Sequence, residues 1–241
     1  AFFPCYGLAE ATLFVAGGPW GLGASTLDVS RDALEQKRIA PATAGDRLRL
    51  VSSGAPAEGQ IVRIVDPASR AVVEDRRIGE IWVSGESIAS RYWRTQDEAE
   101  PVFGVTLAAD PGRAFLRTGD LGFLDDGQLF VTGRLKDLII IGGRNYYPQD
   151  LELAAQRSHP NLRPGHAAAY ALPGEARERL AIALEVTRHH NDDDNEAVFA
   201  AVRRALADKE GILPDVITLV AQNGIPRTSS GKVRRGETRV R

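Results

Sequence analysis

The sequence predicts a mixed α+β chain that folds in more than one part. Short runs of alternating hydrophobic residues between residues 60 and 93 are typical of a small antiparallel barrel or sandwich. After residue 137, runs with strand and helix character alternate, which indicates a separate small α+β domain. The chain has 241 residues and is 43% hydrophobic, enough material for one large or two small cores.

Composition excludes several classes of protein. The net charge is −2, so there is no global attraction to nucleic acid or to a membrane surface. The apolar run Leu138–Ile141 is far shorter than the ~20 residues of a membrane-spanning helix, and we predict no membrane span. A single cysteine, Cys5, rules out an internal disulfide and favours a reducing, cytoplasmic setting. The chain begins at Ala1 and contains no methionine, so we expect it to be a piece of a longer protein.

The first half is predicted to be mainly strands. Residues 1–18 predict a buried strand and loop, and residues 20–54 show little periodicity. Strands are then expected at 61–65, 71–73 and 78–83. We expect Trp82 and Trp93 to be core residues rather than platforms for a ligand.

A hairpin is predicted at residues 123–131, because Asp125–Gly127 separates two strand-like runs and supplies the positive φ of a tight turn. Asp120 precedes the hairpin and Arg134 follows it, so both can reach one small ligand. A ribose diol would suit them, since a carboxylate accepts hydrogen bonds from both hydroxyls. From spacing alone the alternative stays open that Asp120 caps a turn and Arg134 is a solvated strand end.

The second half predicts a small α+β domain of roughly a hundred residues. An apolar strand ends at Gly142 and Gly143, which permit close approach of a partner's backbone. Proline in the first turn starts a helix running from Pro148 to about Ser158. Strands at 166–172 and 180–186, a helix at 196–209 and a strand at 215–220 follow. The pair His189–His190 lacks zinc-ligand spacing, and we do not expect a metal there.

The C-terminal run from Gly224 to Arg235 is rich in glycine, serine and basic residues. It is not a phosphate-binding P-loop, because six residues separate the glycine from Gly231–Lys232 and Val233 follows the lysine. It lacks the aromatic residues or the basic helical stripe of a nucleic-acid site. It is therefore either a solvated basic tail or a flexible loop that carries one cation, Lys232, into an active site.

Three motifs occur in an order that resembles the adenylate-forming superfamily of acyl-CoA synthetases, luciferases and peptide-synthetase adenylation domains. They are Arg-Thr-Gly-Asp at 117–120, Gly-Arg-Leu-Lys-Asp at 133–137, and Pro-Arg-Thr-Ser-Ser-Gly-Lys at 226–232. The runs at 6–15 and 143–150 are similar to the fatty acyl-AMP ligase branch in particular. The resemblance spans nearly the whole chain.

The resemblance implies a domain organisation. Residues 1–135 would be the C-terminal part of a large domain, with an inserted segment at about 27–52 and a β subdomain at about 55–135. Residues 136–241 would be a mobile C-terminal domain that pivots at Lys136. In the family the inserted segment is linked to rejection of coenzyme A, whereas composition equally allows an ordinary surface excursion. We expect residues 27–52 to pack on the main body, with protease cleavage slower there than at the termini.

The resemblance also assigns roles to particular residues. Tyr6 would stack against adenine and Gly7 would also belong to the nucleotide site. Asp120 and Arg134 would hold the ribose, and Glu10 would hold the magnesium ion. Lys232 would be catalytic, and Gly142 and Gly143 would line the path of a phosphopantetheine thiol. Tyr6 as a packed core edge and Glu10 as a solvated carboxylate stay open as alternatives. Ala9 stands where many family members have a threonine that contacts the α-phosphate, so that contact is in doubt.

The function implied is ATP- and Mg²⁺-dependent activation of a fatty acid to an acyl-adenylate, followed by acyl transfer to an acyl carrier protein. The triphosphate loop and the acyl pocket lie upstream in family members, so we expect this chain not to adenylate alone. Two alternatives are an acyl-CoA synthetase of the same fold and a binding module that has lost the chemistry. The presence of Asp120, Arg134 and Lys232 together argues against the second.

Overall fold

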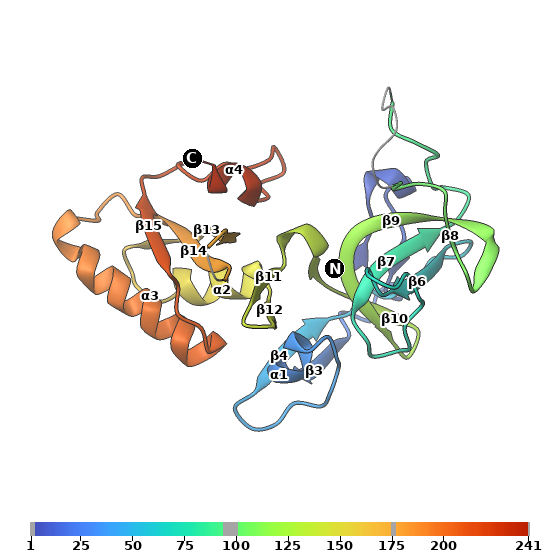
Figure 1. Cartoon of the computed structure of the whole chain (residues 1–241), viewed down its shortest axis with the longest axis horizontal. Helices are drawn as coiled ribbons and strands as arrows, with labels where there is room; N and C mark the ends of the chain where they lie inside the picture. The colour runs from blue at the N-terminus through green and yellow to red at the C-terminus, as the bar shows by residue number, and fades with distance from the viewer. Residues whose placement is uncertain (1–2, 94–100, 175–176, 241) are drawn as a thin grey trace. The chain divides into compact units, whose positions relative to one another are not determined.

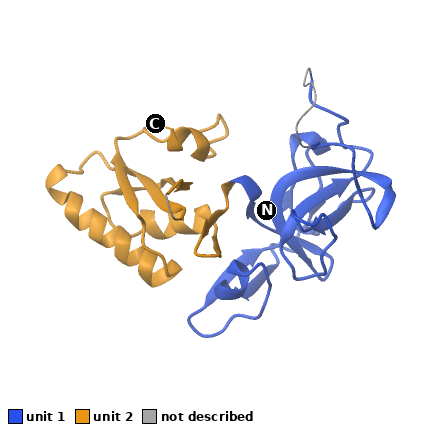
Figure 2. Cartoon of the chain, viewed as in Figure 1, with its two compact units in different colours: residues 1–136 blue, residues 137–241 orange. Residues whose placement is uncertain are grey.

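The computed structural model describes residues 3–93, 101–174 and 177–240. The chain divides into two compact units, Ala1–Lys136 and Asp137–Arg241 (Figure 2). The predicted boundary lies one residue earlier, and that the boundary acts as a hinge stays a prediction. Within the described ranges, no helix is long and apolar enough to cross a membrane.

Unit 1 is built from antiparallel strands (Figure 1). Its main sheet has the order β10-β9-β7-β6, with β8 paired to β9. The members are β6 (Ile61–Val65), β7 (Gly79–Ser84), β8 (Val105–Leu107), β9 (Asp110–Asp125) and β10 (Gln128–Arg134). A second sheet joins β1 (Cys5–Tyr6), β2 (Ala16–Gly17) and β5 (Ala55–Pro56). Among the described residues the main sheet runs in an open path, so a closed barrel is not confirmed.

Strand β7 is the centre of this unit, because all six of its residues are buried. Ile81 and Val83 join a cluster with Val62 and Leu129, whereas Trp82 joins a different cluster that contains Phe115. This alternation agrees with side chains that point to opposite faces of a sheet covered on both sides. The prediction that Trp82 lies in the core is confirmed.

Two other sequence predictions in this unit are wrong. Trp93 is 88% exposed, so it is not a core residue. Residues 71–73 do not form a strand: Val72 makes only an isolated bridge to Val65. The turn at Asp66, whose side chain accepts hydrogen bonds from the backbone N–H groups of Ala68 and Ser69, returns the chain to β6. The pairing there is limited to this bridge and two backbone hydrogen bonds, from Asp66 N–H to the Ala71 carbonyl and from Val73 N–H to the Ile64 carbonyl. The predicted strand in residues 1–18, of which residues 1 and 2 lie outside the described ranges, is two short strands separated by the 3₁₀ turn Ala9–Ala11.

The segment predicted as an insertion at about 27–52 forms a small substructure within unit 1. It contains β3 (Thr26–Ser30), α1 (Arg31–Glu35) and β4 (Arg47–Val51), with β3 and β4 paired antiparallel. Backbone hydrogen bonds attach it to the rest of unit 1, from Ile39 N–H to the Arg76 carbonyl and from Ile78 N–H to the Lys37 carbonyl. Its rate of cleavage by protease stays a prediction.

Unit 2 is built on a three-stranded sheet, and its two longer helices pack against one face of that sheet. Its strands are β13 (Leu162–Leu172), β14 (Arg179–Val186) and β15 (Val216–Val220), with β14 antiparallel to β13 and parallel to β15. The helices α2 (Pro148–Gln156) and α3 (Asn195–Glu210) bury Leu151, Val198 and Leu206 in one core cluster with this sheet. The hairpin β11 (Ile139–Ile141) and β12 (Arg144–Tyr146) precedes α2, and the short helix α4 (Arg235–Arg239) ends the unit. The predicted helices and strands are present, whereas β12 and α4 were not predicted.

The bulge in β9 is the feature that shapes the candidate site. Between the paired positions Glu80/Leu121 and Trp82/Arg117, β7 contributes Ile81 alone and β9 contributes residues 118–120. Side chains satisfy the backbone at this bulge: the Thr118 hydroxyl donates to the Ile81 carbonyl at 2.7 Å, and the Gly119 N–H donates to Glu80 Oε1 at 3.2 Å. Gly119 has a φ of 70°, which favours glycine. Bulges of this kind redirect side chains next to functional sites.

Glu80 holds this bulge from inside the protein. Its side chain is 2% exposed, and Oε2 accepts hydrogen bonds from Trp82 Nε1 at 2.9 Å and Arg117 Nε at 3.2 Å. The Arg117 guanidinium also lies 5.7 Å from the centre of the Trp82 ring. A buried carboxylate with this set of donors is fully engaged, and removing its charge breaks the buried ion pair with Arg117.

Glu80→Gln should therefore lower the free energy of unfolding of unit 1 by roughly 2–4 kcal/mol, because a buried charge pair is broken. Urea unfolding followed by tryptophan fluorescence measures this, since Trp20, Trp82 and Trp93 all belong to unit 1. The matched control is Asp110→Asn, which breaks the exposed Arg113–Asp110 pair and should change stability by about 1 kcal/mol or less. Equal shifts for the two variants would refute the role given to Glu80.

Candidate functional site

Asp120 and Arg134 face each other across the β9–β10 ladder. They are direct register partners, and Arg134 Nε lies 2.8 Å from Asp120 Oδ1. The connecting turn has positive φ at Asp126 and Gly127, so the predicted tight hairpin is confirmed. The Asp120 side chain is 14% exposed and that of Arg134 is 63% exposed, so the pair lies at the surface with its cationic side toward solvent.

Tyr6 joins the same carboxylate from β1. Its hydroxyl donates a hydrogen bond to Asp120 Oδ2 at 2.7 Å. Burial, together with the negative charge of Asp120, raises the pKa of the Tyr6 phenol well above its ordinary value, so the hydroxyl remains a neutral donor. The ring is 9% exposed, which is the packed core edge that the sequence left open as one alternative.

The Asp120 carboxylate keeps capacity for a ligand. Each of its two oxygens offers about two acceptor positions, and the bonds from Tyr6 and Arg134 use one on each. Two hydroxyls of a ribose could use the others. Residues distant in sequence, Tyr6, Asp120 and Arg134, thus form one group that we call the Asp120 clasp. Its role with a nucleotide stays a prediction.

Gly7 has a structural explanation in its own surroundings. A Cβ atom added there would lie 1.4 Å from the Leu13 carbonyl oxygen. Because this oxygen belongs to the backbone, a change of side-chain conformation could not remove the overlap. The glycine therefore allows two stretches of backbone to pack closely, and its role in nucleotide binding stays a prediction.

Glu10 lies in the 3₁₀ turn that follows β1, and its Oε1 accepts a hydrogen bond from the Tyr92 hydroxyl at 2.7 Å. The residues that the structure describes contain no cluster of three metal-ligating side chains. Magnesium in nucleotide sites is bound through one or two carboxylates together with phosphate oxygens and water, and a single glutamate fits that mode. The assignment of Glu10 to magnesium stays a prediction.

Lys136, Gly142 and Gly143 lie around the unit boundary. Lys136 is the middle residue of the 3₁₀ turn Leu135–Asp137 and the last residue of unit 1. Gly142 and Gly143 form the two-residue turn between β11 and β12, with φ values of 60° and 79°. The positive φ at both positions explains the glycines through the turn itself. Pivoting at Lys136 and a pantetheine path at the glycines stay predictions.

Lys232 lies in a closed loop of the C-terminal tail. An isolated bridge between Arg227 and Val233 closes the loop. The Lys232 N–H donates to the Thr228 hydroxyl at 3.0 Å, and the Thr228 N–H donates to the Lys232 carbonyl at 2.9 Å. The lysine is exposed, so its ammonium group is presented by a folded loop rather than by a structureless tail.

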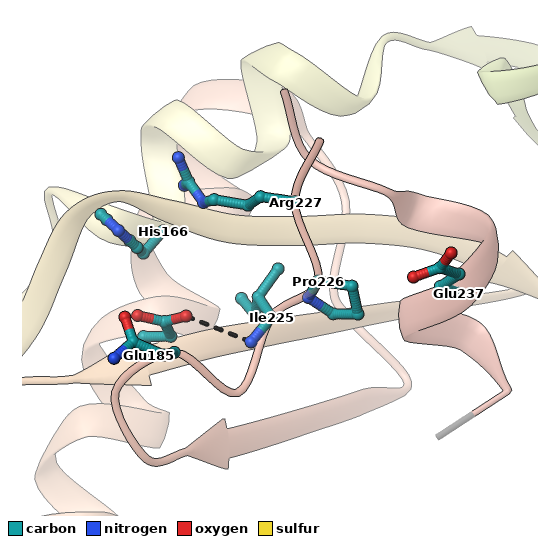
Figure 3. A pocket seen from close by; sticks show the side chains of 7 residues that line it. His166, Glu185, Ile225, Pro226, Arg227 and Glu237 are labelled. Carbon is teal, nitrogen blue, oxygen red and sulfur yellow. Dashed lines mark hydrogen bonds between the residues drawn. The ribbon is translucent and has the colours of Figure 1, made fainter. Parts of the chain in front are cut away.

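A pocket of about 390 Å³ lies beside the base of this loop (Figure 3). His166, Glu185, Pro226, Arg227 and Glu237 are among the residues that line it. Glu185 is fully buried, and it accepts hydrogen bonds from Ile225 N–H at 3.1 Å and Arg163 Nη1 at 2.8 Å. No pattern in the sequence indicated this pocket.

The sequence pattern predicted a strand at 78–83 but did not single out Glu80 within it. The signal available was a glutamate inside an otherwise apolar strand, which requires buried partners.

His190, one of the two adjacent histidines in the sequence, lies beside the start of α3. Its Nε2 is 2.8 Å from Asn195 Oδ1, in the first residue of that helix.

No family model matches the chain, but comparison with individual proteins gives clear matches. It is 42% identical over 247 residues to the medium-chain-fatty-acid–[acyl-carrier-protein] ligase JamA of Moorena producens, covering 100% of this chain and 42% of that protein. It is 37% identical over 243 residues to the long-chain-fatty-acid–AMP ligase FadD28 of Mycobacterium tuberculosis, covering 97% and 41%. The chain therefore spans about two fifths of the length of these relatives.

Solved structures agree with these matches. A structure from a study of fatty acyl-adenylate ligases from E. coli and L. pneumophila has a TM-score of 0.83 at 33% identity and covers 98% of this chain and 40% of that one. The fatty acyl-adenylate ligase of L. pneumophila, in complex with acyl adenylate and pyrophosphate, has a TM-score of 0.55 at 38% identity, covering 100% and 42%. In sequence and in fold, the chain belongs to the adenylate-forming superfamily and matches part of the length of its fatty-acid–AMP ligases.

Proposed function

We propose that this chain works within a fatty acyl-AMP ligase, which activates a fatty acid with ATP and passes the acyl group to a carrier protein. The observation that carries the proposal is the Asp120 clasp, in which one carboxylate accepts hydrogen bonds from Tyr6 and Arg134 directly before the unit boundary. The names of the relatives add the substrate class: a fatty acid for both, and an acyl carrier protein for JamA.

The clasp would hold the ribose of ATP through its two hydroxyls. A charged acceptor makes hydrogen bonds that are roughly twice as strong as neutral ones, so Asp120 would contribute strongly to nucleotide affinity. Arg134 donates a hydrogen bond to one oxygen of the carboxylate and Tyr6 donates to the other, so that the carboxylate is held in one orientation. The ring of Tyr6 offers an apolar edge against which adenine can pack.

Glu10 would hold a magnesium ion together with the phosphate oxygens of ATP, and Tyr92 orients its carboxylate. The ion supplies charge neutralisation at the triphosphate. Cys5 is a free thiol, which is in keeping with a reducing, cytoplasmic setting.

Lys232 would act in the first half-reaction. An oxygen of the fatty carboxylate attacks the α-phosphorus, the bond from that phosphorus to the bridging oxygen breaks, and pyrophosphate leaves with the electron pair. Negative charge is then shared among the carboxylate, the phosphoryl group and the leaving group. An ammonium group at these oxygens positions the carboxylate and stabilises the transition state.

The second half-reaction would use a different orientation of unit 2. The thiol of a phosphopantetheine arm attacks the acyl carbonyl, a thioester forms, and AMP leaves. We assign the turn at Gly142 and Gly143 to the path of this arm, because both residues lack a side chain at an exposed turn. We assign the segment at 27–52 to rejection of coenzyme A, so that a carrier protein is the acceptor. Thioester formation with free coenzyme A would instead favour an acyl-CoA synthetase.

Lys232→Ala, made in the enzyme that contains this chain, should slow acyl-adenylate formation by about 10²–10³-fold, because one preorganised cation is lost from the transition state. Pyrophosphate release measures this step, and transfer from a preformed acyl-adenylate should stay near the rate of the unaltered enzyme. The matched control is Lys209→Ala, an exposed lysine near the end of α3. Pyrophosphate release at the unaltered rate in the Lys232 variant would contradict the role of Lys232 in adenylate formation.

Lys136→Pro should impair acyl transfer to the carrier more than adenylate formation, because the proline ring fixes φ at the proposed pivot. The two half-reactions are measured separately in single-turnover experiments. Lys136→Ala is the control, since it removes the charge but leaves φ free. Equal losses in both half-reactions for the proline variant would count against a pivot at this residue.

A further inference from the structure

The tail that carries Lys232 is tied to the rest of unit 2 by the side chain of Arg235, three residues further along. Arg235 Nε and Nη2 donate to the two oxygens of Glu152 at 2.7 and 2.8 Å, which is a bidentate pair. Its Nη1 donates to Asp137 Oδ2 at 2.8 Å. The Arg235 side chain is 20% exposed and that of Glu152 is 11% exposed, so the pair is largely shielded from water.

The two carboxylates belong to different parts of the unit. Glu152 lies on α2, and its Oε1 also accepts a hydrogen bond from the Ala169 N–H of β13 at 3.0 Å. Asp137 is the first residue of unit 2 and directly follows Lys136. One guanidinium therefore joins the tail to a helix, to the sheet and to the start of the unit.

The loop between these anchors is short and closed. Ile225 and Val233 pack against Ala168 and Ala183, which are paired neighbours in the sheet. The buried Glu185 carboxylate holds the Ile225 N–H on the entering side of the loop, as Figure 3 shows. Arg235 holds the leaving side. The position of Lys232 relative to unit 2 is thus set at both ends of the loop.

We propose that Arg235 is a positioning residue for Lys232. It fixes the loop to the first residue of unit 2, so that rotation at Lys136 moves the lysine together with the unit and the loop does not shift within it. This inference rests on the proposed function. It assigns to Arg235 no contact with substrate: the residue acts through the loop. A purely structural role would instead lower stability and reduce both half-reactions together.

Arg234 provides the contrast within the same tail. It pairs with Glu237 at the surface, where their side chains are 49% and 48% exposed. Its N–H also donates to the Pro226 carbonyl, a backbone bond that a side-chain substitution leaves in place. Arg234→Gln is therefore a matched control, with the same change of residue and charge one position away.

The first test follows the tail itself in this chain. Hydrogen exchange of the backbone amides in residues 228–240 should be faster in Arg235→Gln by on the order of tenfold to a hundredfold, because charge-assisted bonds to two carboxylates are lost. Arg234→Gln should leave it within about threefold of the unaltered chain, as expected for an exposed pair. Unchanged exchange in Arg235→Gln would overturn the proposal irrespective of the enzyme's activity.

The second test uses the enzyme that contains this chain. Arg235→Gln should lower kcat for acyl-adenylate formation by roughly ten- to a hundredfold, because a misplaced catalytic group costs rate. KM for ATP and transfer from a preformed acyl-adenylate should be unchanged, since the Asp120 clasp lies in unit 1. Asp137→Asn, which keeps the bidentate Glu152 pair, should show the same selective loss to a smaller extent, and it decides the question if Arg235→Gln does not fold.

The outcomes separate the two claims. If Lys232→Ala is impaired while both Arg235→Gln and Asp137→Asn adenylate at the unaltered rate, the positioning role is refuted and the proposed function stands. If the variants lose both half-reactions equally, Arg235 is structural and the inference fails. If Lys232→Ala itself adenylates normally, the proposed function fails first.

Discussion

The hydrogen bonds made by one carboxylate, Asp120, join the parts of unit 1 on which the proposed chemistry depends. Tyr6 reaches it from the beginning of the chain, and Arg134 reaches it from the last strand before the boundary. Its position follows from the bulge at Thr118–Asp120, and the bulge in turn is held by the buried Glu80. A surface group that would bind a ligand is therefore fixed by a charge pair inside the protein.

Unit 2 uses the same arrangement for an exposed cation. Lys232 is presented at the surface, whereas the carboxylates that hold its loop are buried: Glu185 on the entering side and Glu152, through Arg235, on the leaving side. Burial opposes ionisation of Glu185, yet the backbone N–H groups of Ile225 and Asn223 and the Arg163 guanidinium hold its pKa below the ordinary value. Its contribution to stability is therefore present at neutral pH and is lost as the pH falls through that lowered pKa. Precise placement of both functional groups depends on buried carboxylates.

Local patterns in the sequence were sufficient for the elements that local chemistry determines. Asp126–Gly127 between two apolar runs predicted the hairpin, and the hairpin brought Asp120 and Arg134 together. Pro148 marked the start of α2, and the helical period marked α3. Residues 117–120, 133–137 and 226–232 predicted the adenylate-forming superfamily, and the similarity to its ligases in sequence and in fold confirms that prediction.

What depends on distant partners could not be predicted. Glu80 is engaged by Arg117 and Gly119, residues nearly forty positions away, and Arg235 by residues 83 and 98 positions away. Trp93 was assigned to the core from its residue type, but burial depends on what packs over a side chain, and 88% of it is exposed. The valines at 72 and 73 have strand propensity, yet they pair with β6 over a single bridge only, and propensity does not determine the length of the pairing.

The proposed function requires the Asp120 carboxylate to accept hydrogen bonds from the ribose hydroxyls of the nucleotide. A crystal structure of the enzyme that contains this chain, bound to a non-hydrolysable acyl-adenylate analogue, tests it most directly. We expect both ribose hydroxyls to lie within hydrogen-bond distance of Asp120, with the Tyr6 hydroxyl still donating to the same carboxylate. A ribose bound elsewhere, with Asp120 engaged only by Tyr6 and Arg134, would contradict it.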